Sequence, residues 1–184
     1  MLSGAAAAVL IGGGLAVVAA SNADPAGQPP TGSATQTQAA RSGGTGDVGE
    51  PAPEMTVTTL DGDEVEVPNE LPAVLFFFAG WCTTCVPEAQ ALGQLQEELG
   101  DKVVILAVSV DPTDTRQAID TFMAAAGNPT YVVAHDLDGS VTQAYDVAAL
   151  DTTVIVDAGG TVVFRDAAPT TLDQLRDAVR LAGA

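Results

Sequence analysis

Basic residues are scarce in this chain of 184 residues. Six Lys and Arg side chains stand against 24 Asp and Glu, which gives a formal net charge of −18. A surface of this sign repels phosphate backbones and anionic headgroups, so nucleic-acid binding and polybasic membrane docking are excluded. Any membrane contact is therefore expected only through the apolar N-terminal segment.

Cysteine and histidine are also scarce, with two Cys and one His. A four-cysteine zinc site within the chain is excluded, and His135 cannot complete a ligand set. A core of roughly 130 residues can fold without disulfides, so the two cysteines are free for chemistry. We expect no metal site, and we expect His135 to be structural.

The first 53 residues differ in composition from the rest. Residues 4–20 carry no charged side chain, so residues 1–20 are predicted to be a signal peptide or a membrane anchor. Residues 21–53 are rich in Ala, Gly, Pro and Thr, a composition that buries too little apolar surface to fold and predicts a flexible tether. We therefore expect an exported domain over residues 54–184, either anchored or secreted.

Beyond residue 53, strand and helix patterns alternate. Apolar residues alternate on either side of Asp61-Gly62, which predicts a hairpin. Helical spacing predicts three helices, the second capped by Thr113 or Asp114 and the third by Thr170 or Thr171. This order predicts an α/β fold, with a mixed central sheet and helices on both faces. The predicted strands are 73–78, 103–110, 131–134, 154–156 and 162–165, and the predicted helices are 87–99, 113–126 and 172–181.

The two cysteines lie in the sequence FFFAGWCTTC at 76–85, which leads from a buried strand into a helix expected to begin at Cys82. Side chains three residues apart in a first helical turn share a face, so Cys82 and Cys85 lie within disulfide range. The helix N-terminus favours a thiolate at Cys82, which is expected to be the exposed, attacking sulfur. Cys85, nearer the core, is expected to be the resolving sulfur.

A CxxC pair also occurs in zinc knuckles, haem attachment sites and inert disulfides. Haem attachment requires His after the second Cys, where this chain has Val86. Zinc would require further ligands from another chain. An inert disulfide stays open as an alternative, although so short a loop removes little entropy from the unfolded chain.

These residues, with the elements around them, resemble the thioredoxin superfamily and, within it, the extracytoplasmic TlpA/ResA-like thiol-disulfide oxidoreductases. The resemblance implies a thioredoxin-like fold with an N-terminal β-hairpin extension. It also implies reduction of disulfides in exported proteins, often apocytochrome c before haem attachment, with electrons from a CcdA- or DsbD-like membrane protein and no cofactor. It covers about residues 51–181 and rests on PAP at 51–53, LDG at 60–62, GWCTTC at 80–85, Glu88, SVD at 109–111, YDV at 145–147 and TTVIVD at 152–157.

Two positions depart from this family pattern. Members usually carry a cis-proline before the Thr-Thr strand, where this chain has Asp151, and many carry Pro where it has Thr84. A cis bond before a non-proline residue costs about 2.5–4 kcal/mol, so the Leu150–Asp151 bond is expected to be trans. A carboxylate near Cys82 would disfavour its thiolate; the alternative is that Asp151 caps the strand through backbone N–H groups.

Glu88 and Trp81 complete the candidate site. By the resemblance, Glu88 lies under the active-site helix and exchanges protons with Cys85; the alternative is an exposed helical Glu. Trp81, the sole Trp, is expected to shield the sulfurs. The polar dipeptide Thr83-Thr84 generally makes such a pair less reducing than the thioredoxin type, which leaves the direction of electron flow open.

We predict a reductase that acts through Cys82 and Cys85. One alternative is a disulfide oxidase or isomerase on the same fold, which the reduction potential of the pair distinguishes. Another is a Sco-like copper metallochaperone, although such proteins have CxxxC spacing and a His that residues 148–150 lack. A peroxidase is disfavoured because its cysteine would not normally come as a CxxC pair after Trp.

Overall fold

The computed structural model describes residues 45–184. The predicted signal peptide or anchor, and the tether up to residue 44, lie outside the described residues. No helix within 45–184 combines the length and the apolar character needed to cross a bilayer. The elements are β1 (Met55–Thr58), β2 (Glu64–Val67), β3 (Ala73–Phe78), the 3-10 turn η1 (Thr83–Cys85), α1 (Val86–Leu99), the 3-10 turn η2 (Gly100–Lys102), β4 (Val104–Ser109), α2 (Arg116–Ala125), β5 (Val132–His135), α3 (Ser140–Ala144), β6 (Thr152–Val156), β7 (Val162–Asp166) and α4 (Leu172–Leu181).

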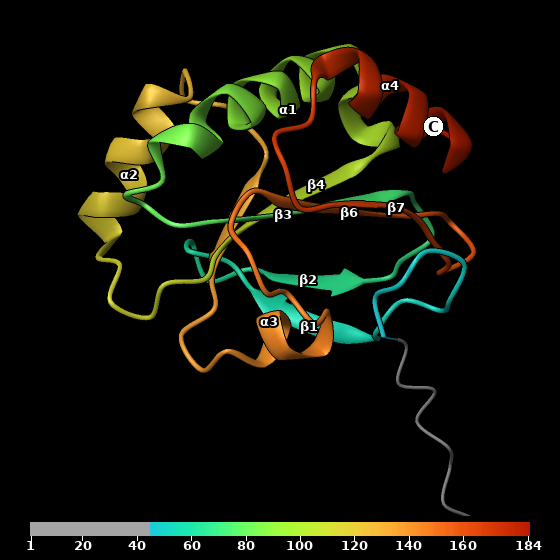
Figure 1. The fold of residues 1–184 in the computed structure, drawn as a ribbon, viewed down its shortest axis with the longest axis horizontal. Helices are drawn as coiled ribbons and strands as arrows, with labels where there is room; N and C mark the ends of the chain where they lie inside the picture. Colours follow the sequence, from blue (N-terminus) through green and yellow to red (C-terminus); the bar gives the residue numbers. More distant parts are fainter. Residues whose placement is uncertain (1–44) are drawn as a thin grey trace, which may run out of the picture. The chain divides into compact units, whose positions relative to one another are not determined.

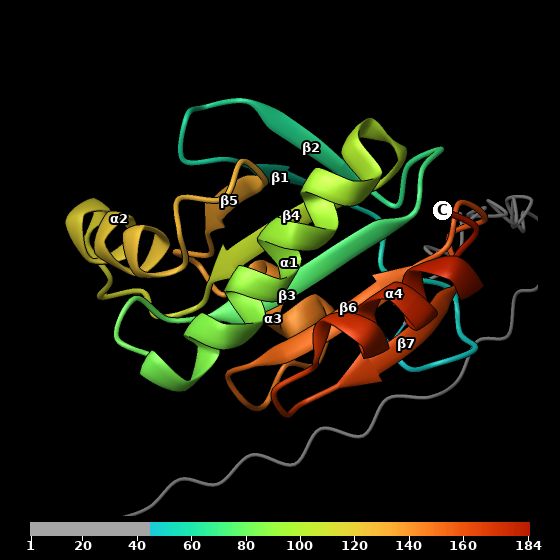
Figure 2. The same ribbon diagram turned by 90° about the horizontal axis from the view of Figure 1, so that it is seen from above.

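The central sheet is mixed, as predicted. Its strand order is β5-β4-β3-β6-β7, with β3, β4 and β5 parallel and with β6 and β7 antiparallel to their neighbours. Helices α1, α2 and α4 cover one face, whereas α3 and the β1–β2 hairpin cover the other (Figure 1). Seen from above, α1 and α4 run side by side over the sheet (Figure 2). The fold is thioredoxin-like, with the N-terminal hairpin extension that the sequence predicts.

Strand β3 forms the centre of both cores, because all of its side chains are buried. Phe76 and Phe78 point toward the α1 side, and Leu75 and Phe77 point toward the hairpin side. Full burial of each such side chain contributes about 1.5–3 kcal/mol. This apolar strand therefore anchors the turn that carries the two cysteines at its carboxyl end.

Two helix starts differ from the prediction, and one short helix was not predicted. The α-helix α1 begins at Val86, and a single 3-10 turn precedes it, so the helix does not start at Cys82. Helix α2 begins at Arg116 and is capped by Thr115, whose hydroxyl accepts from the Ala118 N–H, not by Thr113 or Asp114. Helix α3 was not predicted, because five residues are too few to display a helical period.

The boundary expected at residue 53 comes too late in the chain. Gly49 N donates to Val162 O at 2.8 Å, and Ala52 is buried. Nη1 of Arg165 donates to Gly46 O at 3.0 Å. Residues 46–52 therefore belong to the folded domain and do not form part of a flexible tether.

Candidate active site

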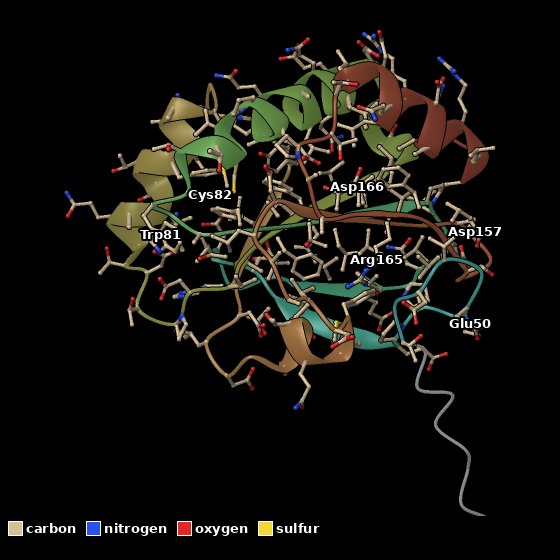
Figure 3. The ribbon with its side chains drawn as sticks, viewed as in Figure 1. Glu50, Trp81, Cys82, Asp157, Arg165 and Asp166 are labelled. Atoms are coloured by element: carbon tan, nitrogen blue, oxygen red, sulfur yellow. A yellow bond between two sulfur atoms is a disulfide. The ribbon has the colours of Figure 1, made fainter. Side chains whose placement is uncertain are left out.

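The two cysteines lie where the turn after β3 enters the 3-10 turn η1. Cys82 N donates to Ala79 O at 2.9 Å, which closes the turn. Cys82 and Cys85 form a disulfide, and their Cα atoms lie 5.4 Å apart. The predicted pairing of these residues is therefore present, and Figure 3 places Cys82 below the start of α1.

The two sulfurs differ less in accessibility than the sequence suggests. Cys82 is only 5% exposed, so the expectation of an exposed cysteine is wrong for the disulfide form. Cys82 belongs to the same cluster of buried core residues as Cys85. Cys85 is completely buried, so the remaining access from solvent is to Cys82.

The two residues between the cysteines are exposed and polar. The Thr84 hydroxyl oxygen lies 3.4 Å from Cys82 Sγ, whereas Thr83 points its exposed side chain to solvent. A disulfide sulfur carries no hydrogen, so in this contact the Thr84 hydroxyl donates. The same donor can stabilise a thiolate at Cys82 after reduction.

Trp81 stands beside the pair but at the surface. Its side chain is 65% exposed at the outer edge of the molecule (Figure 3), and its indole Nε1 donates to Asp111 Oδ2 at 2.7 Å. This bond lowers the pKa of Asp111. His135 Nε2 lies 2.8 Å from the Asp111 carbonyl oxygen, which makes His135 a structural link between β5 and this loop. The role of Asp111 as the partner that orients Trp81 was not predicted from the sequence.

Asp114 fixes the turn that precedes the cysteines. One carboxylate oxygen, Oδ2, accepts from Gly80 N at 2.6 Å and from Ser109 Oγ at 2.6 Å. A Cβ on Gly80 would lie only 3.1 Å from Ala118, so this close approach favours glycine. From the sequence, Asp114 was predicted only as one of two possible helix caps, because its partner Gly80 lies far from it in the chain.

Glu88 is buried in the first turn of α1, with 1% of its surface exposed, so the alternative of an exposed helical Glu is wrong. The Thr153 hydroxyl donates to Oε1 at 2.6 Å, and Thr170 N donates to Oε2 at 2.7 Å. Burial raises the pKa of Glu88 to about 7, because desolvation outweighs these two bonds, and the negative charge of Asp151 raises it further.

Asp151 occupies the loop before β6. Among residues 45–184 only the Val67–Pro68 bond is cis, so the Leu150–Asp151 bond is trans, as expected. Asp151 is 5% exposed, and neither carboxylate oxygen has a hydrogen-bond partner among the described residues. The alternative in which its side chain caps the strand is therefore wrong. Burial raises the pKa of Asp151, while the adjacent Leu150 packs against the core that holds both cysteines.

A thioredoxin-like fold with a CxxC disulfide at the entrance to its first helix defines a thiol-disulfide oxidoreductase. The model of the AhpC/TSA family matches residues 48–165, and the chain belongs to this family. Within the described residues, no cluster of three or more His, Cys, Asp or Glu side chains could hold a metal ion.

Three known proteins illustrate the similarity. The mercury resistance operon ORF3 protein of Streptomyces lividans is 36% identical over 132 residues, which cover 70% of this chain and 69% of that protein. The thiol-disulfide oxidoreductase ResA of Bacillus thuringiensis subsp. konkukian is 28% identical over 134 residues, which cover 71% of this chain and 76% of ResA. A secreted Mycobacterium tuberculosis disulfide oxidoreductase homologous to Escherichia coli DsbE superposes with a TM-score of 0.61 at 26% identity, over 69% of this chain and 95% of that one. The chain is a thiol-disulfide oxidoreductase of the ResA/DsbE type.

Proposed function

We propose that this protein reduces disulfides of exported proteins, with Cys82 as the attacking sulfur and Cys85 as the resolving sulfur. The observation that carries the proposal is the position of a CxxC disulfide at a helix entrance with a buried carboxyl, Glu88, in the next turn. In addition, Cys82 retains some solvent access, whereas Cys85 has none. The Thr84 hydroxyl and the free N–H groups of the first turn favour a thiolate at Cys82.

The reaction runs in two exchanges. The Cys82 thiolate attacks one sulfur of the substrate disulfide, and the other substrate sulfur leaves as a thiolate and takes up a proton. Cys85 then loses its proton and attacks Cys82 Sγ, which forms the internal disulfide and releases the second substrate thiolate. Two electrons pass from the cysteine pair to the substrate, and no cofactor takes part.

Glu88 is the proposed proton acceptor for Cys85. It lies three residues after Cys85 on the same helix, and its carboxyl is shielded from solvent. With a pKa raised to about 7 by burial, the carboxylate can accept a proton near neutral pH. Among the supporting residues, Thr84 contacts the attacking sulfur, Trp81 and Thr83 offer exposed side chains to a substrate, and Leu150 and Asp151 belong to the loop before β6.

The direction of electron flow is decided by the reduction potential of the Cys82/Cys85 pair. Equilibration with a glutathione or dithiothreitol redox buffer, with Trp81 fluorescence as the readout, gives this potential. A value near the roughly −270 mV of thioredoxin is expected for a reductase, and the predicted membrane donor of CcdA or DsbD type fits it. A value near the roughly −120 mV of DsbA would replace this proposal with the oxidase.

The site of action is proposed to lie outside the cytoplasm. The solved relative from M. tuberculosis is a secreted protein, and the apolar residues 4–20 fit a signal peptide or an anchor. Fusion of the full chain to a reporter that is active only after export tests this. We expect activity of the exported reporter; activity confined to the cytoplasm would refute both the location and a membrane electron donor. A role in cytochrome c maturation is a further part of the proposal, tested by haem attachment in a deletion strain.

A further inference from the structure

Asp151 combines three features that each destabilise a folded protein. Its φ is +62°, a region that side chains other than glycine rarely adopt. Its carboxyl is buried, and both carboxylate oxygens lack a partner among the described residues. A residue placed so unfavourably points to a role that needs an ionisable group at this position.

Asp151 lies two residues before Thr153, whose hydroxyl donates to Oε1 of Glu88, so the loop of Asp151 leads directly to Glu88. The negative charge of Asp151 adds to burial in raising the pKa of Glu88. Their surroundings differ. Both oxygens of Glu88 accept hydrogen bonds, from the hydroxyl of Thr153 and from the backbone of Thr170, whereas Asp151 receives none from the described residues. The two donors stabilise the ionised form of Glu88, whereas the interaction that opposes the desolvation of Asp151 is with the side chain of Glu88 itself.

No cation among the described residues offsets the two acids. From β7 the facing ionisable group is Asp166, the cross-strand partner of Thr153, which lies on the α1 and α4 side of the sheet while Arg165 lies on the other (Figure 3). From the cysteine turn, Cys82 and Cys85 belong to the core cluster against which Leu150, the neighbour of Asp151, packs. No ion pair among residues 45–184 includes Glu88 or Asp151. The described arginines bind other groups. These include the carboxylates of Asp61, Asp120, Glu98, Asp173 and Asp177 and the backbone carbonyls of Gly46, Tyr145 and Asp146.

Two buried carboxylates without a cation repel each other, so the pair binds its first proton more tightly than an isolated carboxyl does. We propose that Glu88 and Asp151 form one carboxyl pair that takes up a single proton near neutral pH, and that the ionised pair, rather than Glu88 alone, receives the proton of Cys85. Glu88 is three residues after Cys85, in the first turn of α1. Asp151 is a positioning residue, because its charge holds the proton affinity of Glu88 high. The inference rests on the proposed function of the cysteine pair.

The resolving step transfers one proton from Cys85 and one electron pair to the substrate sulfur. The proton on Cys85 Sγ moves to the carboxyl pair, and the Cys85 thiolate attacks Cys82 Sγ. The new internal S–S bond forms as the bond between Cys82 and the substrate sulfur breaks, and the electron pair leaves with the substrate thiolate. That thiolate is protonated from solvent, and the carboxyl pair returns to solvent the proton that it received from Cys85.

The test is a pH titration of the oxidised full chain, in which the thiols do not titrate. The side-chain carboxyl carbons of 13C-labelled protein are followed by NMR between about pH 4 and about pH 10. In the wild type we expect the Glu88 and Asp151 signals to move together in two common steps. In Asp151→Asn, Glu88 should titrate in one step, with a midpoint lower by about one pH unit. Asn tolerates positive φ and keeps the backbone N–H that donates to Phe77 O, so the loop is preserved.

Asp166→Asn is the matched control, because it removes one negative charge from the same side of the sheet without changing the pair. Independent single-step titrations of Glu88 and Asp151 in the wild type would overturn the pair. An equal shift in Asp166→Asn would also overturn it, since the effect would then be one of overall charge. In the reduced protein, the pH midpoint of mixed-disulfide resolution should fall in Asp151→Asn; an unchanged midpoint overturns the role in proton transfer. Failure of the wild type to reduce any protein disulfide would instead refute the proposed function, and the titration of the oxidised pair would still stand.

Discussion

Substitution of Glu88 by Gln should change how stability depends on pH. Burial raises the pKa of Glu88 from 4.5 to about 7, so the folded protein binds this proton more tightly than the unfolded chain. The contribution of Glu88 is therefore fully present below about pH 4.5 and is lost as the pH rises through about 7. At about 1.4 kcal/mol per pKa unit, the loss amounts to about 3 kcal/mol.

The amide of the Glu88→Gln variant would stay neutral at every pH, so the substitution removes this loss. The NH₂ group of the amide cannot accept a hydrogen bond, so one of the two bonds from Thr153 and Thr170 is given up, at a cost of about 1 kcal/mol. The variant should therefore be less stable than the wild type by about 1 kcal/mol at about pH 3.5 and more stable by about 2 kcal/mol at about pH 9.

Urea denaturation of the oxidised proteins at these two pH values measures the difference. Glu97→Gln, which changes an exposed carboxyl on the same helix, is the matched control and should give nearly the same difference at both pH values. The comparison of variant with wild type cancels every other titrating group. If the Glu88→Gln difference does not change sign or size between the two pH values, Glu88 does not take up a proton on folding, and its assignment as proton acceptor fails.

Three further substitutions test other parts of the site. Thr84→Val removes the hydroxyl next to Cys82, so it should raise the pKa of Cys82 and slow its alkylation near neutral pH about threefold. The control Thr83→Val should leave the alkylation rate unchanged. Equal alkylation rates in Thr84→Val and in the wild type would contradict a role of the Thr84 hydroxyl at Cys82. Asp151→Pro should be less stable than Asp151→Asn by about 3 kcal/mol or more in urea denaturation. The reason is that Pro cannot adopt positive φ and lacks the N–H that donates to Phe77 O. Equal stability of the two variants would mean that the loop adopts another path. Asp114→Ala leaves the Gly80 N–H without its acceptor and should cost about 1–3 kcal/mol of stability, measured in the same way.

Much of the fold was predictable because its signals are local. The continuous apolar run of β3 predicts a strand buried on both faces, and the structure has it in the middle of the sheet. The alternating residues around Asp61-Gly62 predict the hairpin, and the CxxC spacing predicts the disulfide. Each of these patterns depends on neighbours within a few residues, so the sequence alone carries it.

The rest depends on contacts between distant segments. The burial of Glu88 requires Thr153 and Thr170, which lie 65 and 82 residues away, and helical spacing cannot distinguish a buried from an exposed Glu at this position. Asp111 and Asp114 look alike in the sequence, as acids after a strand, but one orients Trp81 and the other the backbone before Cys82. The near-complete burial of Cys82 likewise follows from tertiary packing around the turn.

Disulfide trapping tests the roles of Cys82 and Cys85 most directly. The reduced Cys85→Ser and Cys82→Ser variants are each incubated with a disulfide-bonded protein, and covalent adducts are measured by non-reducing electrophoresis and mass spectrometry. Cys85→Ser should accumulate a mixed disulfide through Cys82 that dithiothreitol releases, because no resolving thiol is left. Cys82→Ser should form little or none, because Cys85 is completely buried. Adducts in equal amounts from both variants, or from Cys82→Ser alone, would contradict the assignment of the attacking sulfur.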